Sequence, residues 1–236
     1  MSGVWVVILI ILFSSIPVFA VYIWFRLAKY GFSLARFLLA LLAGAAAFFP
    51  ALLLQELITY PSSAGGRETL FFQVFVRVAF TEEISRLLVL IPFFIISSRL
   101  RPEEKNQPLT FNTIKNGAAV GLIAGFGFAI LESAVYGASD TGVLLIRAVT
   151  AAPLHGACGS RIGAAAVLFR SNPGQALLRI ITATAIHGIY NFMAAMPGIP
   201  SLAAVLIAVS ALATAIITIH GMAYENASEQ ISGLKK

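Results

Sequence analysis

Residues 70–98 read LFFQVFVRVAFTEEISRLLVLIPFFIISS. The stretch is long enough to cross a bilayer as a helix, which takes about 20 residues, yet it carries Glu82, Glu83 and Arg86 near its middle. A charge at mid-bilayer costs about 2.5–3.5 kcal/mol on insertion scales, so charged residues inside such a span usually face the interior of a helix bundle and mark a functional site. The stretch therefore predicts a membrane helix with a polar, inward-facing centre.

The composition of the whole chain agrees with a membrane protein. Of its 236 residues, 59% are hydrophobic and only 11% are charged, whereas an ordinary soluble domain has about 25% charged residues. This excludes a water-soluble globule, a disordered chain and a disulfide-stapled secreted domain. The single cysteine, Cys158, has no second cysteine with which to form an internal disulfide.

Apolar runs divide the chain into seven expected spans. They cover residues 4–25, 37–57, 70–98, 116–136, 142–169, 175–196 and 201–222. The first run has no basic residue before it, so we expect a retained helix rather than a signal peptide. The expected fold is an all-α, polytopic membrane bundle of about seven transmembrane helices. It forms a single membrane-embedded domain over residues 1–236, with a motif-bearing core at about 70–197.

The loop charges predict an orientation. Eleven basic residues fall on one side of the membrane: Arg26, Lys29, Arg36, Arg99, Arg101, Lys105, Lys115, Arg170, Arg179, Lys235 and Lys236. The opposite side has only Arg67. Because cytoplasmic loops carry the excess of Lys and Arg, we expect a multi-pass cell-membrane protein with its N-terminus outside and its C-terminus in the cytoplasm.

Spacing indicates which charged side chains of the third span can meet. Glu82 and Arg86 are four residues apart and Glu83 and Arg86 three, so Arg86 can pair with either acid. The two glutamates point about 100° apart on a helix and cannot have the same role. A pair of carboxylates in different environments is what general acid–base chemistry at neutral pH needs.

Three other spans contribute polar residues that can converge with this pair. They are Glu132 in the fourth span, His155 in the fifth and His187 in the sixth. At about 1.5 Å per residue, His155 is expected about 20 Å below the outer end of its span. His187 and Asn191 share a helix face, from which they can donate hydrogen bonds to a developing oxyanion.

Two further sets of residues in the spans have a structural interpretation. Glycines at positions 117, 121 and 125 and at 159 and 163 repeat every four residues. Such small faces let helices approach closely, which would bring Glu132 and His155 toward the third span. We expect Arg77, Arg147 and Arg161, which also fall within spans, to reach toward the interface or to pair with a carboxylate.

Four segments together resemble the PrsW family of glutamic-type intramembrane proteases, which is related to the CAAX-processing (ABI) proteases. They are residues 82–86 (EEISR), 126–136 (FGFAILESAVY), 155–159 (HGACG) and 187–191 (HGIYN). Each is weak alone, but all four occur in this order, each within an apolar span. The Glu at position 132 favours PrsW, because CAAX-type proteases usually have His there. One departure is that the PrsW glutamate motif commonly ends in Lys, where this chain has Arg86.

The resemblance implies hydrolysis of a peptide bond in or near the membrane, without a cofactor. Glu82 would activate a water as general base with the help of His155. Glu83 would be oriented by Arg86.

The same resemblance implies roles for the remaining motif residues. His187 and Asn191 would stabilise the tetrahedral oxyanion, and Glu132 would be a further polar member of the site. The implied partner is a membrane-anchored protein substrate, such as a single-span anti-sigma factor.

Several alternatives stay open at the level of sequence. Two histidines and several glutamates could bind zinc in a metal-dependent protease, although the HExxH motif is absent. A CAAX-type endopeptidase is a second possibility. Intramembrane Glu, Arg and His are also typical of ion- or proton-coupled transporters, and an inactive relative would have the same helices. Cys158 lies three residues after His155, but a small packing residue is the simpler interpretation.

Overall fold

The computed structural model describes residues 3–28, 30, 32–59, 66–100, 111–137, 146–147, 149–196 and 201–233. Its elements are α1 (Gly3–Leu27), α2 (Leu34–Leu57), α3 (Arg67–Phe71), the π-helix η1 (Phe72–Phe80), α4 (Thr81–Leu100), α5 (Phe111–Gly137), α7 (Ala151–Leu168), α8 (Pro173–Ala195) and α9 (Ser201–Gly233). The described residues contain no strand. Because α3, η1 and α4 follow one another without a break, the described residues form seven long helical segments, and the predicted all-helical membrane bundle is confirmed.

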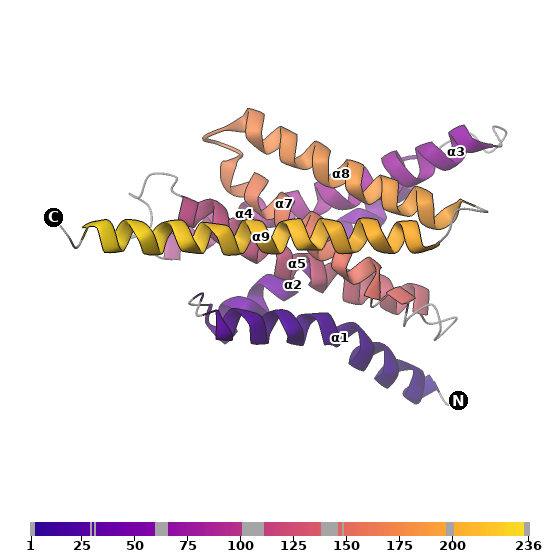
Figure 1. Ribbon diagram of the computed structural model, residues 1–236. Coiled ribbons are helices and arrows are strands. Elements are labelled where there is room, and N and C mark those ends of the chain that lie inside the picture. The colour runs from indigo at the N-terminus through magenta and orange to yellow at the C-terminus, as the bar shows by residue number, and fades with distance from the viewer. Residues whose placement is uncertain are drawn as a thin grey trace.

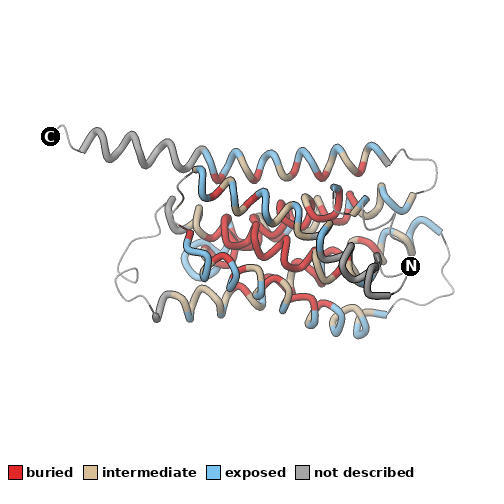
Figure 2. Tube along the Cα trace, turned by 90° about the horizontal axis from the view of Figure 1, so that it is seen from below, coloured by how far each residue is buried: buried red, intermediate tan, exposed pale blue. Residues whose placement is uncertain are grey.

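Within the part of the chain that the structure describes, three helices meet the length and hydropathy expected of a membrane span by themselves: α2, α5 and α9. Of the most apolar part of α5, 78% is buried inside the protein, against 33% for α2 and 28% for α9. Helix α5 is therefore the centre of the bundle, and α2 and α9 lie at its periphery. Figure 2 shows the buried residues gathered along the central helices and the C-terminal helix α9 along one edge, and Figure 1 shows α1 at the opposite side from α8.

Helices α5 and α7 have the most extensive contact in the bundle, and glycine makes it possible. The α-carbons of Gly121 and Gly159 each lie against the other's backbone carbonyl oxygen, and a Cβ on either would overlap that oxygen. Gly117 and Gly163 face each other in the same way one turn further along. The predicted close approach of these two helices is confirmed.

The third predicted span differs from the regular helix that its length suggested. It runs through the π-helix η1 before the α-helical segment that holds the glutamate pair. Thr81 stands at this junction, where its hydroxyl donates to the carbonyl oxygens of Arg77 (2.6 Å) and Val78 (3.0 Å). A π-helical turn within a helix often marks a functional site, and here it ends immediately before Glu82.

The start of the fifth predicted span, at residue 142, lies outside the described residues. Within the described residues, helix α7 begins at Ala151, after Thr150, whose backbone is not helical. Proline fits best in the first turn of a helix, where its missing N–H leaves no hydrogen bond unmade. Pro153, the third residue of α7, suits the start at Ala151, although α1, α2 and α4 each contain a proline in their interior. His155 lies one turn into α7, about 6 Å along its axis from Ala151.

Candidate active site

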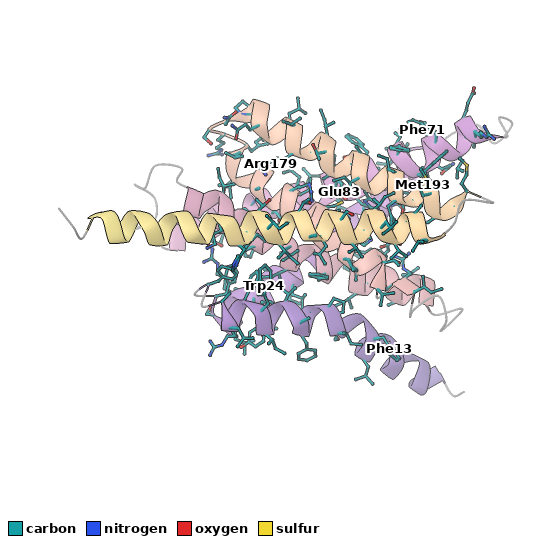
Figure 3. All side chains as sticks on the ribbon, viewed as in Figure 1. Phe13, Trp24, Phe71, Glu83, Arg179 and Met193 are labelled. Carbon is teal, nitrogen blue, oxygen red and sulfur yellow. The ribbon has the colours of Figure 1, made fainter. Side chains whose placement is uncertain are left out.

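A cluster of charged and imidazole side chains is buried in the middle of the bundle. It is contributed by four helices, and its members are Glu82, Glu83 and Arg86 from α4, Glu132 from α5, His155 from α7 and His187 from α8. Each of these residues is at most 8% exposed, and Glu83 and Arg86 are fully buried. Figure 3 labels Glu83 near the midpoint of the bundle. Six of the seven residues singled out from the sequence therefore meet in one place.

Arg86 is the centre of this cluster. Its Nη1 donates to both carboxylate oxygens of Glu83, at 2.7 and 2.6 Å. Its Nη2 donates to Glu82 Oε2 at 3.3 Å and to His155 Nδ1 at 2.8 Å. The guanidinium also lies over the ring of Phe128, 4.4 Å from the ring centre. One permanent cation thus connects both glutamates to a histidine of another helix, in the planar geometry that arginine prefers.

The two adjacent glutamates have different surroundings, as their spacing predicted. Both oxygens of Glu83 accept from Arg86, and Oε1 accepts a further hydrogen bond from His187 Nδ1 at 2.8 Å. Glu82 is held more loosely, by Arg86 and by Gln55 Nε2, which donates to its Oε1 at 3.3 Å. Glu83 is therefore a fixed anchor, whereas Glu82 keeps acceptor capacity for another molecule.

Glu82 also faces a small cavity. The cavity has a volume of about 60 Å³ and is lined by Phe48, Ala51, Leu52, Gln55, Glu82, Phe128, Glu132 and Val135. A water molecule takes about 30 Å³ of the liquid, so the space admits water but no peptide. Of the sequence-predicted residues, only Glu82 and Glu132 line it.

The hydrogen bonds of His155 assign its protons. A guanidinium only donates, so Nδ1 of His155 accepts from Arg86 and carries no proton. The other nitrogen, Nε2, then carries the proton and donates to Glu132 Oε2. Glu132 is held in turn by Arg147, whose Nη2 lies 2.6 Å from the same oxygen. Both ring nitrogens of His155 therefore already have a partner, Arg86 at Nδ1 and Glu132 at Nε2.

His187 has the opposite arrangement. Its Nδ1 donates to Glu83, because that carboxylate already accepts from Arg86 and can only accept. In the neutral ring, Nε2 then has a free lone pair, and it lies 3.8 Å from Glu82 Oε2. This geometry is that of a base or a metal ligand. As a neutral ring His187 cannot donate to an oxyanion, and only its protonated form can.

Asn191 is the one predicted site residue that stands apart. It lies one turn beyond His187 on α8 and is half-buried. Its side-chain amide makes no hydrogen bond to another described residue. Its position on the helix follows the prediction, but its amide is not joined to the cluster.

The family of the chain is decided by a match over most of its length. Residues 33–218 match the model of the PrsW family, described as intramembrane metalloproteases. The chain belongs to the PrsW family. Searches of curated proteins and of solved structures found no match. The match extends well beyond the four motifs and covers every helix that contributes to the buried cluster. The chain is accordingly a membrane protein of a peptidase family.

The description of the PrsW family implies a metal, and three residues offer a place for one. Ligand atoms of Glu82, His155 and His187 all lie within 4.8 Å of one another. Catalytic zinc sites use three protein ligands with a free lone pair on each. Glu82 and His187 meet this requirement, but His155 does not, because Arg86 takes the lone pair of its Nδ1 and its Nε2 is protonated toward Glu132. As arranged, the residues do not fit a zinc ion.

Two residues of this PrsW site were missed as site members. Gln55 on α2 touches Glu82, and it was overlooked because the second span carries no motif; an amide within an apolar run is the signal that could have found it. Arg147 was expected to reach the interface or to pair with a carboxylate, and it pairs with Glu132.

Two other residues considered from the sequence lie outside the site. Arg161 donates to the Ala157 carbonyl and to the Thr214 hydroxyl. The Cys158 thiol donates to the Ala183 carbonyl oxygen at 3.5 Å. Its hydrogen-bond partner is therefore a backbone group and not His155.

Proposed function

We propose that this PrsW-family protein is a glutamic-type intramembrane endopeptidase in which Glu82 activates the attacking water. The observation that carries the proposal is the asymmetry of the glutamate pair. Glu83 is fully engaged by Arg86 and His187, whereas Glu82 faces the water-sized cavity with acceptor capacity to spare. A general base must be within hydrogen-bond reach of the proton that it removes, and of the two acids only Glu82 lines the cavity where a water can be held.

The hydrogen bonds favour His187, rather than His155, as the imidazole that assists Glu82. Glu82 Oε2 and His187 Nε2 are 3.8 Å apart, so a water that moves from the cavity to the His187 side of Glu82 could donate to both, although of the two residues only Glu82 lines the cavity itself. When that water attacks the carbonyl carbon of the scissile peptide, Glu82 takes one of its protons and passes it to His187 Nε2. Protonated His187 would be stabilised by Glu83, as a carboxylate orients and stabilises the histidine of a catalytic triad.

The remaining steps use the same groups. Protonated His187 carries a hydrogen on Nε2 and can donate it to the developing oxyanion or to the leaving amine. Breakdown of the tetrahedral intermediate cleaves the C–N bond, gives one chain a new carboxylate and the other a new amine, and returns the base to its starting form. Arg86 balances the negative charge of the two glutamates in the resting site and so keeps Glu82 available as a carboxylate base. Asn191 would join only when substrate is bound.

The proposed substrate is a membrane-anchored protein with a single span, such as an anti-sigma factor. A peptide must reach Glu82 from within the bilayer, and the cavity beside it lies between α2, α4 and α5. The proposed orientation places the N-terminus outside and the C-terminus in the cytoplasm, because the basic residues gather in the loops on one side.

The test is cleavage of a reporter library of single-span membrane proteins by the purified protein in lipid. Wild type is compared with Glu82→Gln and with the control Glu56→Gln, a glutamate exposed at the end of α2. Loss of cleavage in Glu82→Gln alone is the expected result. Equal cleavage by a folded Glu82→Gln variant would remove Glu82 from the mechanism. If no protein in the library is cut by any variant, ion-flux measurements follow, since transporters share these intramembrane charges.

A metal-dependent peptidase is the second candidate, favoured by the convergence of Glu82, His155 and His187. Each cleavage reaction is therefore repeated after treatment with a chelator and after zinc is restored. Cleavage that is lost with chelator and recovered with zinc would establish this alternative.

A further inference from the structure

The three donors at the centre of the site have the surroundings of a metal site. A metal-bound histidine usually donates its second ring N–H to a carboxylate, which fixes its orientation. Both histidines do so here, since His187 Nδ1 donates to Glu83 and His155 Nε2 to Glu132. With Glu82 they form a His₂Glu set, one of the sets of three protein ligands found in catalytic zinc sites.

A side chain of the protein already occupies the position between these donors. Arg86 Nη2 is 2.8 Å from His155 Nδ1 and 3.3 Å from Glu82 Oε2. Zinc binds imidazole nitrogen at about 2.0–2.1 Å, so an ion at His155 Nδ1 would have to displace Nη2. The guanidinium and a metal ion therefore compete for the same lone pair and the same carboxylate.

Arg86 is not placed to move aside. Its other terminal nitrogen is held by both oxygens of Glu83, its plane lies over Phe128, and the side chain is fully buried. A guanidinium remains charged under all physiological conditions, so it supplies a permanent positive charge in the place where a metal would supply one.

We propose that the Arg86 guanidinium takes the place of a metal cation in this site, and that removing its charge converts Glu82, His155 and His187 into a zinc site. The metal implied by the family description is then not a cofactor of this chain. The inference concerns the affinity for metal and does not depend on proteolysis. It fails if the wild-type protein binds zinc at these residues, whereas the proposed function fails if membrane substrates stay uncut.

The experiment is a metal titration of the purified full-length protein in lipid, after removal of any affinity tag. Wild type, Arg86→Met, Arg86→Lys and the double variant Arg86→Met/His155→Ala are dialysed against Zn²⁺, and bound zinc per chain is measured. Co²⁺ titrations report the coordination geometry from the visible absorption. Methionine is chosen because it keeps an unbranched side chain against Phe128 while removing the charge.

We expect no stoichiometric zinc in wild type or in Arg86→Lys at micromolar zinc. Arg86→Met should bind one zinc per chain at least about 100-fold more tightly than wild type, with the absorption of tetrahedral Co²⁺. The second substitution, His155→Ala, should abolish this binding. One equivalent of zinc in wild type that is lost in Glu82→Gln and His187→Ala would overturn the proposal, and this measurement does not require any Arg86 variant to fold. A folded Arg86→Met protein that binds no more zinc than wild type would overturn it as well.

Discussion

The α-carbon of Gly125 on α5 lies directly against the backbone carbonyl of His155 on α7. A Cβ at Gly125 would overlap the His155 carbonyl oxygen and would come within 2.6 Å of the carbonyl carbon. The glycine thus sets the distance between the central helix and the one that carries a histidine of the site. A packing residue without any functional group therefore determines where His155 stands relative to Arg86 and Glu132.

Gly125→Ala should consequently reduce activity through the position of His155. The added methyl has to push against backbone, and overpacking of a tight core costs about 1–3 kcal/mol. We expect cleavage of a membrane reporter to fall at least about 10-fold, with a lower unfolding temperature. The control is Gly174→Ala, because the nearest atom to a Cβ there is 3.9 Å away. An active Gly125→Ala enzyme with unchanged stability would contradict this account of α5–α7 packing.

The sequence predicted much of this site because the residues carry their own signals. Charged groups in an apolar span have to be buried together, and the spacing of Glu82, Glu83 and Arg86 decides which of them pair. The same argument predicted that Glu132, His155 and His187 converge with the glutamate pair. These predictions need only helical geometry and the cost of charge in a membrane.

Other features depend on contacts that no spacing rule contains. The π-helix η1 changes the helical register before Glu82, and no residue pattern in Phe72–Phe80 predicts a π-helix rather than an α-helix. The protonation of His155 and His187 follows from which neighbour each nitrogen meets, Arg86 or a glutamate. The role of Gln55 depends on α2 packing against α4.

Arg147→Ala should impair the enzyme by releasing Glu132. Arg147 Nη2 is 2.6 Å from Glu132 Oε2, and the two side chains are 17% and 10% exposed. Removing one partner of a largely buried ion pair leaves an uncompensated charge, at a cost of about 3–5 kcal/mol in fully buried cases. We expect a loss of cleavage of about 10- to 100-fold, partly restored in Arg147→Lys. Arg67→Ala, at an exposed arginine, is the control; if it and Arg147→Ala behave alike, the pair has no role in the site.

Ala51→Leu tests whether water in the cavity is needed. Ala51 is 1% exposed and lines the cavity of about 60 Å³ beside Glu82. The three added carbons would fill most of that space and displace water without touching the charged residues. We expect kcat to fall at least about 10-fold while the protein still folds. Ala51→Ser, which is small and polar, should remain active. Full activity of Ala51→Leu would mean that water reaches Glu82 by another path.

The orientation of the bundle can be tested with single cysteines. The protein's own cysteine is buried, with its thiol directed to the Ala183 carbonyl, so Cys158→Ala provides a background that should keep its activity. Cysteines are then placed at Arg67 and at Lys105, the latter outside the described residues. A membrane-impermeant thiol reagent added to intact cells should label position 67 and not position 105, because the basic loops lie in the cytoplasm. Labelling of position 105 alone would invert the proposed topology, and the buried cluster would then face the cytoplasmic half of the membrane.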